Sequence, residues 1–217
     1  MKQMLNVSNL KVSFGEVCAV KDLSIKISEG QIVSITGANG AGKSTTMKVL
    51  LGLARPSIGS VYVNGVNPFD DFDLRNKIGF VPEYDCFYEH MSAVDYVTYF
   101  LLIHDFDRGE ANTRAKNSLV ELGLQDAMHR KIRTYSRGMR QKTKVARATA
   151  FDPEILVLDE PTAGVDVKLK KNLWNNVKTL NKQAVTIILT THLMYEAEEM
   201  CDRIAIINKG NLIKLDT

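Results

Sequence analysis

The sequence predicts a mixed α/β fold with a parallel β-sheet core, an antiparallel β region and an inserted α-helical lobe. Three observations support this fold class: β-branched runs fill residues 4–82, apolar residues recur at helical spacing over 92–151, and strands alternate with helices from residue 155 onward. The chain has 217 residues, of which 45% are hydrophobic and 24% charged, so it resembles an ordinary globular domain in composition.

The first block is expected to consist mainly of strands. The runs LSIKI, QIVSIT, SVYVNG and KIGFVP are rich in β-branched residues, and Glu-Gly, Asn-Gly and Pro signals separate them. One helix is expected to open at Lys43.

The second and third blocks differ in their apolar period. Helical spacing in the second block is carried by Ala111, Ala115, Leu119 and Leu122. In the third block ILVLD, VTIILTT and RIAIIN are predicted strands, the last of them being the final strand expected, and a helix between the first two carries Leu169, Leu173, Val177 and Leu180 on one face. Strands that are apolar on both faces indicate a covered parallel sheet.

Charge gives no support for a polyanionic partner. The formal net charge is +3 and is spread along the chain, so neither DNA nor RNA binding is expected. One stretch is locally basic, and its charged residues are Arg137, Arg140, Lys142, Lys144 and Arg147. At helical spacing they spread around the helix, which predicts a solvated or partner-facing surface.

Cysteine content and hydropathy indicate the redox environment of the chain and whether it can span a membrane. Cys18, Cys86 and Cys201 form no Cys-x-x-Cys pair, which suits a reducing environment. No run approaches the roughly 18 to 20 apolar residues that a membrane-spanning helix needs. We therefore expect a chain that does not itself cross a membrane.

A phosphate-binding loop follows the run QIVSIT. The segment GANGAGKST matches the pattern G-x-x-x-x-G-K-[ST] with a strand before it and a helix after it. Its residues are Gly37, Ala38, Asn39, Gly40, Ala41, Gly42, Lys43, Ser44 and Thr45. Backbone amides of such a loop bind phosphate oxygens, the lysine adds a positive charge, and the serine hydroxyl can bind Mg²⁺. The motif predicts a phosphate-loop NTPase.

Two carboxylates lie at the end of the strand ILVLD, because Asp159 is its last residue and Glu160 follows directly. In phosphate-loop enzymes an acid at this position reaches Mg²⁺, which suits Asp159. The adjacent Glu160 is then placed to accept a proton from the attacking water.

With these motifs, nearly the whole chain resembles the nucleotide-binding subunit of ATP-binding cassette (ABC) transporters. Residues 37–45 match the Walker A motif and ILVLDE matches Walker B, with Glu160 at the catalytic glutamate position and His192 at the switch histidine position. The resemblance implies one ABC ATPase domain over 1–217, with 1–83 and 152–217 as the nucleotide-binding core and 84–151 as the helical subdomain. ATP and Mg²⁺ are the implied cofactors.

YSRGMRQK resembles the family signature, which implies a paired assembly. Two cassettes pack head to tail in this family, so Ser136, Arg137 and Gly138 would contact the nucleotide held by the other copy. AGVD ends at Asp166, which matches the loop that faces the partner cassette. A homodimer or a pair of different cassettes is therefore expected.

Two further positions are assigned by the resemblance. Phe14 matches the aromatic residue that stacks on adenine, with a core phenylalanine at a strand end as the alternative. Glu83 stands where most cassettes have a metal-binding glutamine, so it adds a negative charge near the phosphates.

The helical lobe begins with an aromatic segment, YDCFYEH. Its aromatic residues are Tyr84, Phe87 and Tyr88. We expect them to bind a short helix of a membrane subunit. Packing inside the lobe is the alternative.

The resemblance implies an ATPase subunit at the cytoplasmic face of the membrane that powers integral membrane transporter subunits, with export favoured. VPE and GANGAGKST also occur in cassettes of branched-chain amino-acid importers, so import stays open. A repair or translation ATPase and a nucleotide sensor without hydrolysis stay open as well.

Overall fold

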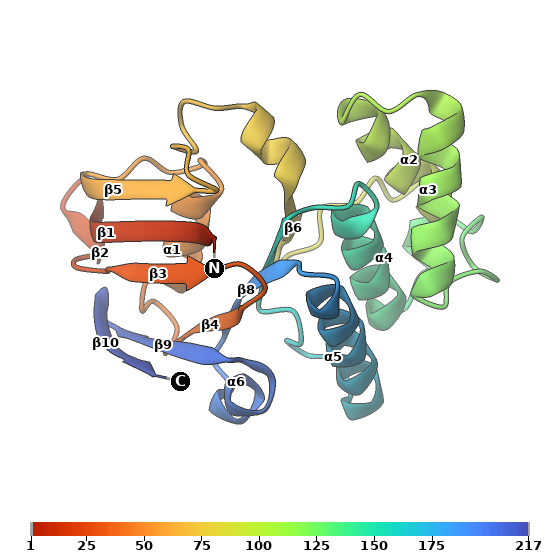
Figure 1. Cartoon of the computed structure of the whole chain (residues 1–217). Coiled ribbons are helices and arrows are strands. Elements are labelled where there is room, and N and C mark those ends of the chain that lie inside the picture. The colour runs from red at the N-terminus through yellow and green to blue at the C-terminus, as the bar shows by residue number, and fades with distance from the viewer. Residues whose placement is uncertain (1, 217) are drawn as a thin grey trace.

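The fold places an antiparallel sheet and a helical lobe on opposite sides of a central, mainly parallel sheet (Figure 1). The computed structural model describes residues 2–216 without the side chains of Lys168 and Leu169, so the predicted apolar position of Leu169 lies outside the described residues. The predicted α/β fold class is confirmed.

The central sheet has the strand order β10-β9-β4-β8-β7-β6. Its parallel strands are β4 (Ile32–Thr36), β6 (Ile78–Val81), β7 (Ile155–Asp159), β8 (Thr186–Thr191) and β9 (Arg203–Asn208). Every residue of β4, β7 and β8 is buried. Both faces of this sheet are therefore covered, as its apolar strands predict.

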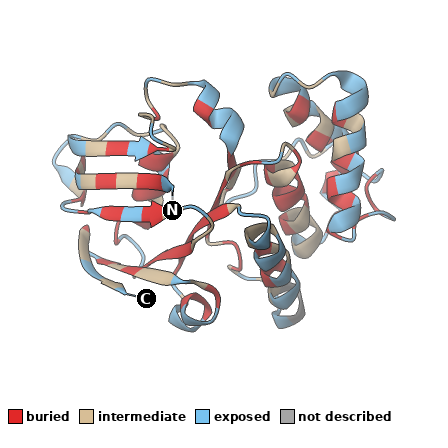
Figure 2. Cartoon of the chain, viewed as in Figure 1, coloured by how far each residue is buried: buried red, intermediate tan, exposed pale blue. Residues whose placement is uncertain are grey.

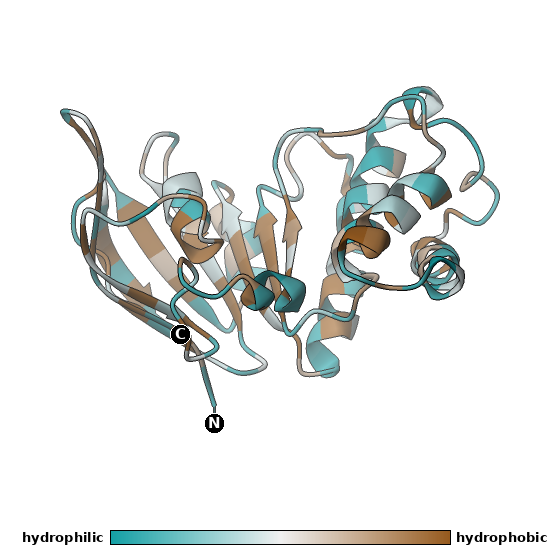
Figure 3. Cartoon of the chain, turned by 90° about the horizontal axis from the view of Figure 1, so that it is seen from above, coloured by the Kyte–Doolittle hydropathy of each residue, from teal (hydrophilic) through white to brown (hydrophobic). Residues whose placement is uncertain are grey.

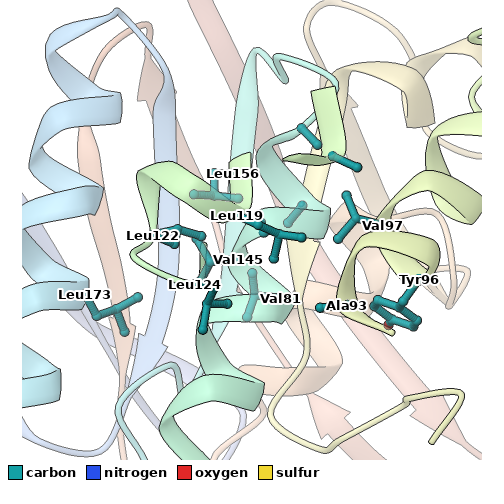
Figure 4. Close-up of a cluster of buried hydrophobic side chains, with 14 of the residues drawn as sticks. Val81, Ala93, Tyr96, Val97, Leu119, Leu122, Leu124, Val145, Leu156 and Leu173 are labelled. Atoms are coloured by element: carbon teal, nitrogen blue, oxygen red, sulfur yellow. The ribbon is translucent and has the colours of Figure 1, made fainter. Parts of the chain in front are cut away.

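Alternate residues of β7 feed two different cores. Ile155 and Val157 pack in the core shared with the antiparallel sheet, whereas Leu156 and Leu158 pack in the core shared with the helical lobe. Figure 4 shows Leu156 in the second core, together with Leu119 and Val145 of the lobe. The period-two alternation of a strand thus joins the lobe to the rest of the chain.

The antiparallel sheet lies on one side of the central sheet, and a short helix packs in the core between them. Its strands are β1 (Gln3–Phe14), β2 (Val17–Val20), β3 (Ile25–Ser28) and β5 (Ile58–Val63). Met47 and Leu50 of α1 (Lys43–Leu50) pack into the core between the two sheets. This packing fixes α1, whose first residue belongs to the phosphate loop.

The helical lobe follows β6. Its elements are α2 (Ala93–Ile103), α3 (Arg108–Glu121), the short 3₁₀ helix η2 (Ile132–Thr134) and α4 (Arg137–Thr149), and the 3₁₀ helix η1 (Asp73–Lys77) precedes β6. Ser92, Asp107 and Ser136 cap α2, α3 and α4 with their side chains. Each cap accepts a backbone N–H that the first helical turn leaves without a partner.

Hydropathy and burial follow these layers. The central strands are strongly apolar, and the helices carry hydrophilic stretches alongside apolar ones (Figure 3). Buried residues concentrate in the sheet and on the inner faces of α3 and α4 (Figure 2). Ala111, Ala115 and Leu119 are fully buried, as their spacing predicts.

The chain continues from β7 through α5 (Val167–Lys182), β8 and α6 (Met194–Met200), and then through β9 to β10 (Asn211–Asp216). Strand β10 is not predicted from the sequence, because its hairpin turns at Lys209-Gly210 rather than at Asn-Gly or Asp-Gly. Both turn residues have positive φ, 48° and 82°, as a tight two-residue hairpin requires. Among the helices of residues 2–216, none is long and apolar enough to cross a membrane.

Candidate functional site

The phosphate loop joins the end of β4 to the start of α1. Gly42 is the N-cap of α1 with φ 107°, a conformation that an L side chain rarely adopts. A Cβ at Gly37 would collide with the backbone oxygen of Ile207 in β9. Glycine is therefore required at both ends of the loop, for backbone conformation at one and for close packing at the other.

Lys43 points back into the loop that precedes it. Its Nζ donates to the backbone oxygens of Gly37 at 2.8 Å and Ala38 at 3.3 Å, and lies 3.5 Å from Glu160 Oε1. The Lys43 and Glu160 side chains are only 7% and 9% exposed. The cation and the carboxylate of the two predicted motifs thus meet at one buried point.

A hydroxyl and a carboxylate from distant motifs also meet. Ser44 Oγ lies 3.4 Å from Asp159 Oδ1, although the two residues are 115 positions apart. Thr190 Oγ1 in β8 donates to the same Asp159 oxygen at 2.5 Å and accepts the Glu160 N–H at 3.0 Å. Sequence reasoning missed Thr190, because a threonine pair at the end of the strand TIILTT does not by itself identify its partners on another strand.

Glu160 also contacts the predicted switch histidine. His192 Nδ1 lies 2.8 Å from Glu160 Oε2. Glu160 has φ 46°, in the left-handed region that non-glycine residues rarely occupy, and its hydrogen bond to Thr190 stabilises that conformation. Backbone strain is therefore located at the residue predicted to handle the water proton.

A cavity of about 600 Å³ collects most of the predicted nucleotide and catalytic residues. The predicted residues that line it are Asn39, Gly40, Ala41, Gly42, Lys43, Ser44, Thr45, Glu83, Glu160 and His192. Gly37 and Asp159 contribute from behind this lining, through Lys43 and Ser44 respectively. A triphosphate-sized ligand fits such a volume.

Phe14 lies at the end of β1, beside this cavity rather than in its lining. It pairs with Val17 of β2, which does line the cavity. Phe14 is 56% exposed, so the alternative of a core phenylalanine is wrong. An exposed ring near the cavity leaves adenine stacking as a prediction.

The signature residues form a different cavity. Ser136, Arg137, Gly138 and Asp166 line a space of about 480 Å³ at the start of α4. Ser136 Oγ accepts the Met139 N–H at 3.3 Å, and Arg137 Nη2 donates to the Ala163 oxygen at 2.7 Å. Among the described residues, the two cavities share no lining residue. Arg137 also lines a third cavity with Glu83 and Glu160. The predicted signature residues that lie apart from the phosphate-site residues are therefore Ser136, Gly138 and Asp166.

Comparison with known proteins gives this arrangement a family. Residues 20–163 match the family model described as ABC transporter. The chain is 35% identical to the linearmycin resistance ATP-binding protein LnrL of Bacillus subtilis, over 99% of this chain and 69% of the relative. It is 32% identical to a Nod factor export ATP-binding protein of Cupriavidus metallidurans, over 98% of this chain and 71% of the relative.

Comparison with solved structures points to the same family. A dimeric ATP-binding cassette in a post-hydrolysis state, bound to ADP and Pi, superposes with a TM-score of 0.90 and 28% identity, covering 99% of this chain and 98% of that chain. The chain therefore belongs to the ABC transporter family, as an ATP-binding and ATP-hydrolysing cassette that pairs with a second cassette and associates with membrane subunits.

Proposed function

We propose that this cassette holds Mg·ATP between two copies and powers export through membrane subunits, to which it attaches at the cytoplasmic face of the membrane. Relatives named for linearmycin resistance and Nod factor export support the direction. The observation that carries the shared site is the separation of the phosphate cavity from the signature cavity. A head-to-tail pair would bring the signature cavity of one copy to the phosphate cavity of the other.

The metal donors are proposed to be Ser44, Asp159 and Glu83. Ser44 and Asp159 already present neighbouring oxygen atoms, which Mg²⁺ prefers. In the part of the chain that the structure describes, no cluster of three or more His, Cys, Asp or Glu side chains could hold a metal. Such a sparse donor set fits Mg²⁺, which usually binds one or two carboxylates together with phosphate oxygens and water. The bound ion would neutralise charge on the phosphates.

Glu160 is the proposed general base. Its carboxylate lies between Lys43 Nζ and His192 Nδ1, at 3.5 and 2.8 Å. Lys43 now binds loop carbonyl oxygens, and we expect it to exchange these for phosphate oxygens, which are stronger acceptors. Glu160 then keeps its contact with His192 and accepts the proton of the attacking water.

The surface that would receive the membrane subunit lies on α2 and the segment before it. Phe87 packs inside the lobe, 5.1 Å from the Tyr96 ring, so the alternative of internal packing holds for this residue. Tyr88 is 53% exposed and meets Tyr99 edge to face at 5.6 Å. We propose Tyr88 and Tyr99, with the exposed Leu102 of α2, as the anchor for the partner helix.

Assays of the purified cassette and of its membrane complex test this function. Wild type should hydrolyse ATP with Mg²⁺, and Glu160→Gln should reduce turnover at least about a hundredfold because the general base is lost. The same variant should form a dimer with Mg·ATP in sedimentation. Absence of Mg²⁺-dependent hydrolysis in wild type, or copurification with ribosomes or DNA instead of a membrane protein, would contradict the proposal.

The docking surface has its own test. Tyr88→Ala combined with Tyr99→Ala should abolish copurification with the membrane subunit and leave hydrolysis by the isolated cassette unchanged. Glu121→Ala, an exposed position on α3, is the matched control in the same lobe. Copurification that survives the double substitution would place the partner elsewhere.

A further inference from the structure

The basic residues of α4 hold the segment that leads from the central sheet into the lobe. Arg140, Lys144 and Arg147 lie at positions that share one face of the helix. Arg147 Nη2 donates to the Phe80 oxygen at 2.7 Å. Arg140 binds both carboxylate oxygens of Glu89, at 2.6 and 2.8 Å. For these three residues the expectation of a solvated or partner-facing surface is wrong, because their side chains bind groups of the same chain.

Lys144 is the most buried of the three. Its side chain is 5% exposed, and its Nζ donates to the backbone oxygens of Pro82 at 3.2 Å and Glu83 at 3.3 Å. Asp85 Oδ1 lies 3.2 Å away. Burial lowers the pKa of Lys144, and the Asp85 carboxylate opposes that shift. An ammonium group has three protons, and three acceptors surround this one, so its burial is compensated.

The contact to Glu83 links Lys144 to the nucleotide site. Glu83 and Lys144 line one cavity of about 370 Å³, to which Asp85 and Glu160 also contribute. Glu83 also lines the phosphate cavity. Lys144 therefore fixes the backbone of a residue that lines the phosphate cavity, and it brings a positive charge to a region with several carboxylates.

The charge of Glu83 explains why such a neighbour matters. A carboxylate near the triphosphate is repelled by it, whereas a neutral glutamine at the same position would not be. The Lys144 ammonium donates to the Glu83 backbone oxygen and lines the same cavity as Glu83, so its positive charge reduces that repulsion through space without occupying the metal position.

We propose that Lys144 is a positioning residue for Glu83: it holds the Glu83 carbonyl and offsets the Glu83 charge, so that this carboxylate can serve the Mg·ATP site. The inference rests on the proposed function, because it assumes that Glu83 faces a bound Mg·ATP. Lys144 itself acts through Glu83 and is not placed in contact with the nucleotide.

A double-mutant cycle separates this role from a merely structural one. Lys144→Met, Glu83→Gln and the double variant are compared for kcat and for the Mg²⁺ concentration that gives half-maximal hydrolysis. Lys144→Met removes a charged hydrogen bond. When residue 83 is Glu, we therefore expect Lys144→Met to lower kcat and to raise the half-maximal Mg²⁺ concentration, each about tenfold. With Gln at position 83 the same change should have less than about a twofold effect, since no charge needs to be offset.

Binding supplies a readout independent of turnover. In the Glu160→Gln background, the Mg²⁺ dependence of binding to a fluorescent ATP analogue should shift in the same way with Lys144→Met. Lys144→Arg keeps the charge, so its Mg²⁺ requirement for binding should lie closer to that of wild type than the requirement of Lys144→Met does. Lys116→Met, an exposed lysine of α3 in the same lobe, is the matched control and should change nothing.

Thermal unfolding of each variant checks that the fold is retained. If Lys144→Met does not fold, Asp85→Asn replaces it, because Asp85 is 43% exposed and pairs with the same ammonium group. Its smaller effect, about threefold, should likewise require Glu83. Losses of equal size with Glu and with Gln at position 83 would overturn the proposal. A wild-type chain without Mg²⁺-dependent hydrolysis would instead contradict the proposed function.

Discussion

The phosphate half and the signature half of the proposed site differ in how far one chain completes them. Lys43 and Asp159 are buried, the Glu160 side chain is 9% exposed, and these residues contact one another's motifs within the chain. Ser136 is exposed, and the signature cavity that it lines shares no lining residue with the phosphate cavity among the described residues. Buried charges need partners inside the fold, whereas the exposed N-terminus of a helix remains available to bind an anion from outside the chain. This difference supports the proposal that each chain supplies the phosphate half of one site and the signature half of the other.

Changing the charge of the signature half should have the largest effect. Aspartate caps helices as well as serine does, so Ser136→Asp should preserve α4 while placing a negative charge where the partner's phosphate would lie. Loss of that contact is expected to lower turnover about a hundredfold. Binding of a fluorescent ATP analogue to the phosphate half of the monomer should not change.

Ser136→Asn is the neutral control, because asparagine also caps the helix. Its turnover should lie much closer to that of wild type. Equal losses for Asp and Asn would mean that the serine hydroxyl, rather than charge, decides the effect, and the comparison would need revision.

Within the phosphate half, Thr190→Val should have the next largest effect. Valine keeps the shape of threonine but leaves the Glu160 N–H and Asp159 without the hydroxyl that joins them. An unsatisfied buried polar group costs about 1 to 3 kcal/mol. Denaturant unfolding should show that loss of stability. In a separate hydrolysis assay, kcat should fall about tenfold.

The control at this position is Thr190→Ser, which retains the hydroxyl. It should recover most of the turnover and lose only the stability that one buried methyl group provides. A fully active Thr190→Val variant would remove Thr190 from the account of how Glu160 is held.

The smallest expected effect concerns the joint between the lobe that carries the signature half and the core that carries the phosphate half. His104 follows α2, its Nδ1 lies 2.9 Å from Asn76 Oδ1, and its ring stacks on the Phe151 ring with centroids 4.2 Å apart. Burial lowers the pKa of His104, with Asp105 opposing the shift. The folded state therefore disfavours the charged form more than the unfolded state does.

The sign of the pH effect follows from this difference. The His104 contribution is retained above the ordinary histidine pKa of about 6.5 and is lost as the pH falls below it, through the lower pKa of the folded state. His104→Phe removes the titration, so the difference in unfolding midpoint between pH 7.5 and pH 5.5 should be smaller than in wild type. An unchanged difference would show that this joint does not titrate.

Sequence reasoning found the phosphate half more completely than its supports. The loop and the acidic strand end could be predicted because their function requires particular residues at fixed spacing along the chain. Thr190 could not, because its partners Asp159 and Glu160 lie on a neighbouring strand and only strand order brings them together. Lys144 was wrongly expected to lie on a solvated or partner-facing surface, since helical spacing does not reveal which loop covers a helix.

The helical lobe shows the same limit at the level of the fold. Its apolar period predicted the buried face of α3. The position of Phe87 could not be predicted, because whether an aromatic residue faces a partner or its own lobe depends on tertiary packing. Apolar period alone does not distinguish an interface from a core.

Mixed dimers test the shared site most directly. Lys43→Met disables the phosphate half and Ser136→Asp disables the signature half, and the two changes can be placed on different chains or on the same chain of a tagged dimer. With the changes on different chains, one intact site remains, so hydrolysis should persist at roughly half the wild-type rate. With both changes on one chain opposite a wild-type partner, each site loses one half and hydrolysis should fall to background. The reverse pattern, with activity only when both changes share a chain, would show that each chain completes its own site.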